Sequence, residues 1–188
     1  MSHGYQVRNQ SGLHFLTFQI VQWADLFTRQ VYKYIVINSF KYCQQHKGLE
    51  IYAYVIMSNH IHLLAKSQND NLSDIIRDFK RHTSKKIIET IEQAPESRRE
   101  WLLMIFRFAA HSHVRNNEYQ VWTHESHAEE IFSNSFIEQK IEYIHQNPVR
   151  SGIVVNPEDY LYSSARNYAD MESIMDVVIA SRRWKTIK

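Results

Sequence analysis

The sequence from position 50 to position 66 reads Glu50-Ile-Tyr-Ala-Tyr-Val-Ile-Met57, then Ser58-Asn59, then His60-Ile-His-Leu-Leu-Ala-Lys66. The first run is rich in β-branched and aromatic residues, which favour strands, and we interpret the second run as a strand as well. The two polar residues between them have the length of a tight turn, although Ser-Asn is a weaker turn signal than Asn-Gly. We therefore expect two antiparallel strands joined as a hairpin.

Residues on either side of this hairpin predict further strands and helices. A period-two pattern over residues 13–23 predicts a strand, and a helical pattern over residues 28–46 ends at Gly48. On the other side of the hairpin, Asn71 or Ser73 caps an amphipathic helix that extends to about Gln93.

The second half of the chain adds a connection, a strand and more helices. Residues 95–117 are more polar and include a short helix, and a fourth strand is expected at residues 119–125. A helix from about Ser135 stops near Pro148, with a turn at Gly152. The tail from Asp170 has the pattern of another amphipathic helix.

This order of elements predicts an α+β fold close to a ferredoxin-like sandwich, in which helices cover an antiparallel or mixed sheet. We expect one domain over residues 1–168, with a helical insert at about residues 95–117. Residues 169–188 would form a helical, basic C-terminal extension.

The composition is typical of a soluble globular protein, with 44% hydrophobic and 22% charged residues in a chain of 188. Cys43 is the single cysteine, which excludes an intrachain disulfide and a CxxC pair. The longest apolar run, residues 101–106, is far shorter than the ~18 residues of a membrane span. The first residues lack an apolar signal core, so we expect a cytoplasmic protein with no membrane partner.

The net charge of +2 is too small to indicate a nucleic-acid partner by itself. Within the helix expected after Asn71, cationic residues recur with helical spacing; these are Arg77, Lys80, Arg81 and Lys85. They suit contacts with phosphates, although a solvated helix face explains each of them equally well.

Two histidines in the second strand of the hairpin are the first candidates for chemistry. Side chains at i and i+2 of a strand point to one face, so His60 and His62 project together, whereas Ile61 and Leu63 point into a core. Two imidazoles held side by side suit a pair of metal ligands. Taken alone, such a pair is more often two hydrogen-bonded histidines than a metal site.

Other histidines give weaker patterns. His111 and His113 have the same spacing but lie in a polar stretch, where nothing fixes their rings. His124 and His127 would share a face only in a helix, and their surroundings indicate a strand and a loop. We expect surface or hydrogen-bonding histidines here, and of the four we expect His127 to approach a functional site.

A second candidate lies in the late helix, which includes Tyr143-Ile-His-Gln-Asn147-Pro-Val-Arg150. Tyr143 and Asn147 are four residues apart, so a phenol and an amide lie on the same helix face. His145 points away from that face. A half-buried tyrosine and an asparagine that ends a helix before a proline would explain these residues equally well.

In this order, the two motifs resemble the single-tyrosine HUH transposases, and most closely the branch of REP-associated tyrosine transposases. The resemblance covers most of residues 13–168. Its clearest segments are residues 57–64, 79–80, 122–127, 143–154 and 160–168. The pairing of the motifs is specific, although the connection at residues 95–117 is longer than in compact members of the family.

The resemblance implies a ferredoxin-like catalytic domain that acts on single-stranded or hairpin DNA. His60, His62 and Asn147 would hold a divalent metal, Mg²⁺ or Mn²⁺, and zinc also suits these ligands. Tyr143 would be the nucleophile and would become joined to a 5′ phosphate. The sequence leaves monomer and dimer open, although related transposases often form homodimers.

Some roles in this scheme are less defined. No general base is evident, and His127 is the residue that we expect to support the reaction. Arg150 follows the helix of the tyrosine and would contact the DNA together with the four cations of the earlier helix.

Two other functions remain open at this point. One is a module that binds hairpin DNA or RNA without cutting it, although the complete set of four candidate residues argues against it. The other is a metal-dependent phosphodiesterase in which water attacks and Tyr143 is structural. Such an enzyme would release free protein, whereas attack by tyrosine would leave a protein–DNA adduct.

Overall fold

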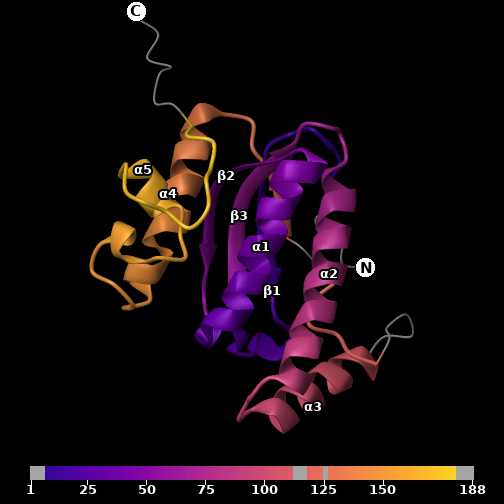
Figure 1. The fold of residues 1–188 in the computed structure, drawn as a ribbon. Coiled ribbons are helices and arrows are strands. Elements are labelled where there is room, and N and C mark those ends of the chain that lie inside the picture. Colours follow the sequence, from indigo (N-terminus) through magenta and orange to yellow (C-terminus); the bar gives the residue numbers. More distant parts are fainter. Residues whose placement is uncertain (1–6, 112–117, 125–126, 181–188) are drawn as a thin grey trace, which may run out of the picture.

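A four-stranded antiparallel sheet lies at the centre of the molecule (Figure 1). The computed structural model describes residues 7–111, 118–124 and 127–180. The strands are β1 (His14–Gln19), β2 (Leu49–Ile56), β3 (His60–Ser67) and β4 (His127–Glu130). The helices are α1 (Gln30–Lys47), α2 (Leu72–Gln93), α3 (Arg99–His111), α4 (Asn134–Arg150) and α5 (Ala165–Tyr168).

The strand order β2-β3-β1-β4 is that of a ferredoxin-like sandwich, which confirms the predicted fold class. The chain alternates as β1-α1-β2-β3-α2-β4, with α3 inserted before β4 and α4 added after it. The predicted hairpin is present, with Met57 and His60 joined by a backbone hydrogen bond across Ser58 and Asn59. The helix expected within residues 95–117 is α3.

Helices cover both faces of the sheet. Successive side chains of β1 point to opposite faces, so they show which helix covers which face. The ring of Phe18 contacts Phe79 of α2 at 5.5 Å, and Phe79 stacks on Phe40 of α1 at 4.5 Å. The ring of Phe15 points to the opposite face and contacts Tyr143 of α4 at 5.9 Å. Figure 1 shows α1 and α2 together on one side of the sheet and α4 on the other. We call the side of α4 the site face.

The fourth strand lies later in the chain than the expected residues 119–125. Trp122 makes only an isolated bridge with Ile20, and its ring packs in the core beside Phe18 and Phe27. Thr123 N donates to Gln19 O at the end of β1, and the regular ladder along β1 begins at His127, which pairs with Thr17. Burial of the tryptophan side chain therefore outweighs the strand pattern around it.

The helix of the tyrosine continues past Pro148 instead of stopping there. Pro148 lacks a backbone N–H, so the helix loses only one hydrogen-bond donor there. Backbone hydrogen bonds of a Schellman motif then end the helix. Ile153 N donates to Pro148 O and Gly152 N donates to Val149 O. Gly152 has φ of 69°, the left-handed conformation that this motif requires, so the predicted turn is present.

The tail does not form the expected helix over residues 170–180. Asp170 has φ of 53°, which breaks a helix, and the segment instead bonds along β2. Val178 N donates to Ile51 O, and Ser164 N, further upstream, donates to Tyr54 O. Pairing with the open edge of β2 therefore replaces helical hydrogen bonds.

No helix in the described part of the chain combines the length and apolar character that a bilayer crossing would need.

Candidate active site

His60 and His62 lie side by side on the site face, as their strand spacing predicts. Their ring centroids are 4.8 Å apart. His62 is buried, and its register partner on β1 is Thr17, while Ile61 and Leu63 are buried on the opposite face. The hairpin thus holds the two imidazoles on one rigid strand.

One nitrogen of each imidazole faces an oxygen of a neighbouring side chain. The Nδ1 atom of His60 lies 2.8 Å from Oδ1 of Asn59, and Nδ1 of His62 lies 2.9 Å from the hydroxyl of Thr17. The remaining ring nitrogen, Nε2, is the one left to bind another group. Sequence spacing indicated the histidines but not these partners, because one requires the turn geometry and the other the register of β1 with β3.

Burial lowers the pKa of both histidines. The pKa of His62 falls to about 3, because burial is reinforced by repulsion from His60, Lys140 and Arg150. Burial lowers the pKa of His60 as well. Both rings are therefore neutral at pH 7, the form in which an imidazole nitrogen can bind a cation.

Tyr143 reaches the histidines from α4. Its ring meets that of His62 edge to face at 5.2 Å, and its side chain is 39% exposed, so substrate can approach it. The guanidinium of Arg150 lies 4.5 Å from the centre of the tyrosine ring and donates to Tyr143 O at 2.8 Å. Residues far apart in the sequence therefore form one site: the hairpin and α4 supply its two halves.

Lys140 attaches α4 to the sheet and was not indicated by the sequence motifs. Its ammonium forms a 2.6 Å ion pair with Glu129 of β4 and lies 4.3 Å from the centre of the Phe15 ring. Because Phe15 also contacts Tyr143 and His62, this lysine belongs to the same cluster. Its position three residues before Tyr143 is the only signal in the sequence that connects it with the nucleophile candidate.

Asn147 follows Tyr143 by four residues on α4 and is buried. Its role as a third metal ligand stays a prediction.

His127 is exposed on β4 and pairs with Thr17, which in turn pairs with His62. Directly paired residues share a face of a sheet, so the three residues form a row across the site face. His127 and His62 are separated by two strand spacings, about 10 Å. His127 therefore lies on the site face, two strands away from His62.

The cations of α2 lie across the sheet from Tyr143, because α2 packs on the face opposite α4. Arg77 and Arg81 form ion pairs with Asp78, and Lys85 lies 3.9 Å from Glu89. Lys80 points inward and donates to Thr123 O at 2.9 Å, and burial lowers the pKa of its ammonium to about 8. Of the five predicted DNA-binding cations, only Arg150 is beside the tyrosine.

Four further histidines were considered in the sequence analysis. His111 ends α3 and is exposed, His124 is exposed, and His113 lies outside the described residues. His145 points away from Tyr143, as expected: its Nε2 lies 2.9 Å from Ser164 Oγ, and its ring contacts Tyr168.

Trp23 is a further residue that the sequence did not indicate. Its side chain is 60% exposed, and its ring lies 6.3 Å from that of His60. Gln22 and Trp23 both have φ of 54°, an uncommon conformation for residues other than glycine. Backbone strain of this kind is concentrated at functional sites.

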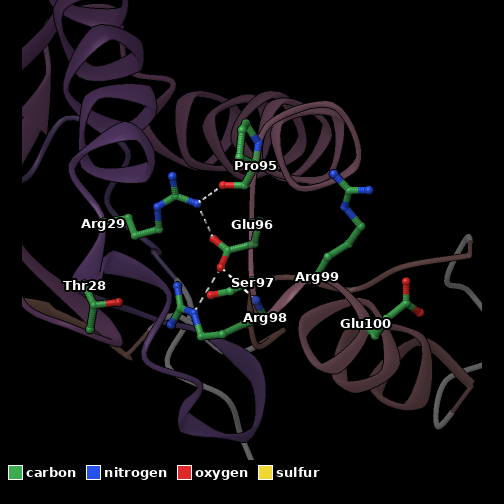
Figure 2. Close-up of a pocket in the computed structure, with 8 residues that line it drawn as sticks. All are labelled: Thr28, Arg29, Pro95, Glu96, Ser97, Arg98, Arg99 and Glu100. Carbon is green, nitrogen blue, oxygen red and sulfur yellow. Dashed lines mark hydrogen bonds and ion pairs between the residues drawn. The ribbon is translucent and has the colours of Figure 1, made fainter.

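A pocket of about 970 Å³ lies elsewhere, at the start of α3 (Figure 2). Its arginines already bind within the protein: Arg29 and Arg98 contact the buried carboxylate of Glu96, and Arg99 donates to Ile91 O and Ala94 O. This pocket contains none of the predicted site residues, and its side chains serve to join α1, α2 and α3.

The donor set at the histidine pair suits a divalent metal. Two neutral imidazoles on one strand can each offer Nε2, and the buried Asn147 carries an amide one helical turn beyond Tyr143. Within the described ranges, no group of three or more histidine, cysteine, aspartate or glutamate side chains forms a metal site.

A solved structure has the same fold. A REP-associated tyrosine transposase bound to a REP hairpin matches with a TM-score of 0.61 at 18% identity, over 97% of this chain and 98% of that chain. A candidate transposase from Deinococcus radiodurans R1 matches with a TM-score of 0.40 at 16% identity, over 77% of this chain and 97% of that chain. Curated proteins give no significant match.

A comparison of the sequence with models of protein families identifies the family of this chain. The model of the family described as IS200-like transposases matches residues 16–147, which include the histidine pair, Tyr143 and Asn147. The chain therefore belongs to the IS200-like transposase family, and the resemblance inferred from the two motifs is confirmed. Transposase function follows from this membership.

Proposed function

We propose that the protein cleaves and rejoins single-stranded DNA at hairpins through a covalent bond between Tyr143 and a 5′ phosphate. The contact between Tyr143 and His62, with ring centroids 5.2 Å apart, is the observation that supports this most directly. Family membership supplies the class of reaction, and the similar solved protein bound to a REP hairpin supports a hairpin substrate.

A divalent metal, Mg²⁺ or Mn²⁺, would be held by the imidazoles of His60 and His62 and the amide of Asn147. When bound, it would neutralise the charge of the scissile phosphate and fix its orientation for in-line attack. The neutral state of both histidines supports this assignment, since protonated imidazoles cannot bind a cation.

Tyr143 would perform the covalent step. Its Oη attacks phosphorus, a P–O bond to the tyrosine forms, and the bond from phosphorus to the 3′ oxygen of the preceding nucleotide breaks. The phenol loses its proton to a base, and the departing 3′ oxygen gains one. We assign the supporting proton transfer to His127, which shares the site face. Attack by a 3′ hydroxyl on the phosphotyrosine is the reverse reaction and rejoins DNA.

Cations and an exposed aromatic ring around the tyrosine would hold the DNA. Arg150 and Lys140 place positive charge beside Tyr143 and His62, where a phosphate would lie. Trp23 offers an open ring next to His60 on which an unpaired base would stack. A role of the α2 cations in DNA binding stays a prediction, and they would contact DNA away from the cleaved phosphate.

The test is an adduct assay with labelled single-stranded hairpin DNA and Mn²⁺, read on a denaturing gel and by peptide mass spectrometry. We expect a slow-migrating adduct that maps to Tyr143 and is lost in Tyr143→Phe, while DNA binding by that variant changes by less than about twofold. Tyr42→Phe is a matched control, because Tyr42 is an exposed tyrosine of α1.

Each outcome of this assay selects one function. An adduct that persists in Tyr143→Phe would exclude this nucleophile. Cleaved DNA without an adduct would identify a phosphodiesterase that uses water, and hairpin binding without cleavage in Mn²⁺ or Mg²⁺ would identify a binding module.

A further inference from the structure

The side-chain amide of Asn59 has only one orientation that satisfies its surroundings. Its Nδ2 lies 3.1 Å from Oδ1 of Asp25 and 3.4 Å from the carbonyl oxygen of Trp23, and neither of these atoms can donate a proton when Asp25 is ionised. A rotated amide would place its oxygen against this carboxylate. The amide nitrogen therefore faces Asp25, and the amide oxygen faces His60.

This orientation determines which nitrogen of His60 is protonated. An amide oxygen accepts hydrogen bonds but cannot donate them, so the 2.8 Å contact requires a proton on His60 Nδ1. Nε2 of the neutral ring then has a free lone pair. The turn between β2 and β3 thus selects one of the two tautomers of His60.

Thr17 occupies the corresponding place beside His62. Its hydroxyl lies 2.9 Å from Nδ1 of His62, and it is fixed by the register of β1 between β3 and β4. A hydroxyl can accept as well as donate, so it stabilises the same Nδ1–H tautomer when Nε2 of His62 binds a cation. The two oxygens come from different elements, a turn and a strand.

We propose that Asn59 and Thr17 are positioning residues that hold His60 and His62 as Nδ1–H tautomers, so that both rings present Nε2 to one divalent cation. This inference rests on the proposed function, because it assumes that the histidine pair binds a metal. Hydrogen-bond partners of this type orient metal-binding histidines and commonly change metal affinity 10- to 100-fold when removed.

The first measurement needs neither metal nor DNA. In the full chain labelled with ¹⁵N, imidazole chemical shifts distinguish Nδ1–H from Nε2–H rings. We expect the Nδ1–H form at His60 in the unmodified protein and a mixture of tautomers in Asn59→Ala. A predominant Nε2–H form at His60 of the unmodified protein would overturn the proposal.

The second measurement is the affinity for Mn²⁺ alone, followed by the paramagnetic resonance signal of the free ion. Asn59→Ala and Thr17→Val are expected to bind Mn²⁺ 10- to 100-fold more weakly, whereas Thr17→Ser, which keeps the hydroxyl, should bind like the unmodified protein. Thr90→Val is a control that removes a threonine hydroxyl of α2 whose hydrogen bond to Lys86 O is exposed. Circular dichroism confirms that each variant is folded.

The results separate this inference from the proposed function. Equal Mn²⁺ affinity in Asn59→Ala and the unmodified protein, or failure of Thr17→Ser to restore it, would refute the positioning role while leaving Tyr143 as the nucleophile candidate. Conversely, if the tautomers and affinities follow expectation but no adduct forms at Tyr143, the positioning role stands and the proposed reaction fails.

Discussion

Tyr143 and the histidine pair show which features of a site follow from spacing alone. Period two on a strand places His60 beside His62, and period 3.6 on a helix places Asn147 on the side of Tyr143. Neither period predicts that Thr17 faces His62 or that Asn59 binds His60, since these contacts depend on strand register and turn geometry. The sequence did not indicate Trp23 either, because its exposure results from an irregular turn after β1.

Replacement of Trp23 tests whether this turn binds DNA. Trp23→Ala is expected to weaken binding of a hairpin with an unpaired flank by about 5- to 150-fold, because stacking of a base on an aromatic ring contributes ~1–3 kcal/mol. Fluorescence anisotropy with labelled DNA measures the change. Trp101→Ala, which removes another exposed tryptophan, should bind normally. If both variants bind like the unmodified protein, Trp23 makes no base contact.

Among the helices and strands, α4 extends to Arg150, past the predicted stop near Pro148, and the site depends on it. Pro148 was expected to end this helix. The last helical turn still forms, because the backbone hydrogen bonds that stabilise it do not use the proline nitrogen as a donor. Strand β4 was misplaced for the opposite reason: its residues, His127–Glu130, are mostly polar, and only pairing with β1 makes them a strand. Tertiary contacts outweighed local pattern in both cases.

The end of α4 can be tested through Gly152. Gly152→Ala should lower the free energy of unfolding by about 1–2 kcal/mol, the cost of a left-handed backbone for a residue with a Cβ. A Cβ at this position would meet no atom within 4 Å, so the loss would come from the backbone alone. Gly152→Asn should lose less, because asparagine tolerates this conformation. Urea denaturation measures the difference, and equal losses would exclude this explanation.

At the scale of the whole molecule, the buried carboxylate of Glu96 joins the helical layer. It accepts hydrogen bonds from Tyr32 of α1 at 2.8 Å and from Arg29 at 3.0 Å, and it contacts Arg98 just before α3. Burial alone would raise the pKa of Glu96, but these bonds and the backbone N–H of Arg98 lower it to about 2. The sequence predicted α1 to α4 and their order, but it did not indicate this cluster.

Acid should therefore destabilise the protein through Glu96. The folded-state pKa is below the ordinary value of 4.5, so the unfolded state takes up the proton first. This stabilisation is present above about pH 4.5 and is lost as the pH falls towards 2. Urea denaturation at successive pH values should show this loss. In Glu96→Gln, the free energy of unfolding should change less steeply with pH. An unchanged slope would show that other groups cause acid unfolding.

Tyr32→Phe complements that experiment at neutral pH. Removal of a hydrogen bond to a buried charge should cost ~1.5–3 kcal/mol of unfolding free energy. Tyr42→Phe, at an exposed position of the same helix, should cost far less.

The pairing of the tail with β2 has a consequence for the order of events during synthesis. Tyr54 and Ser164, which bond across this edge, are 110 positions apart, so a ribosome makes the strand long before the segment that covers it. Until then the growing chain displays an unprotected row of amides and carbonyls. The nascent protein, rather than the finished one, is therefore the form most exposed to pairing with a neighbouring polypeptide.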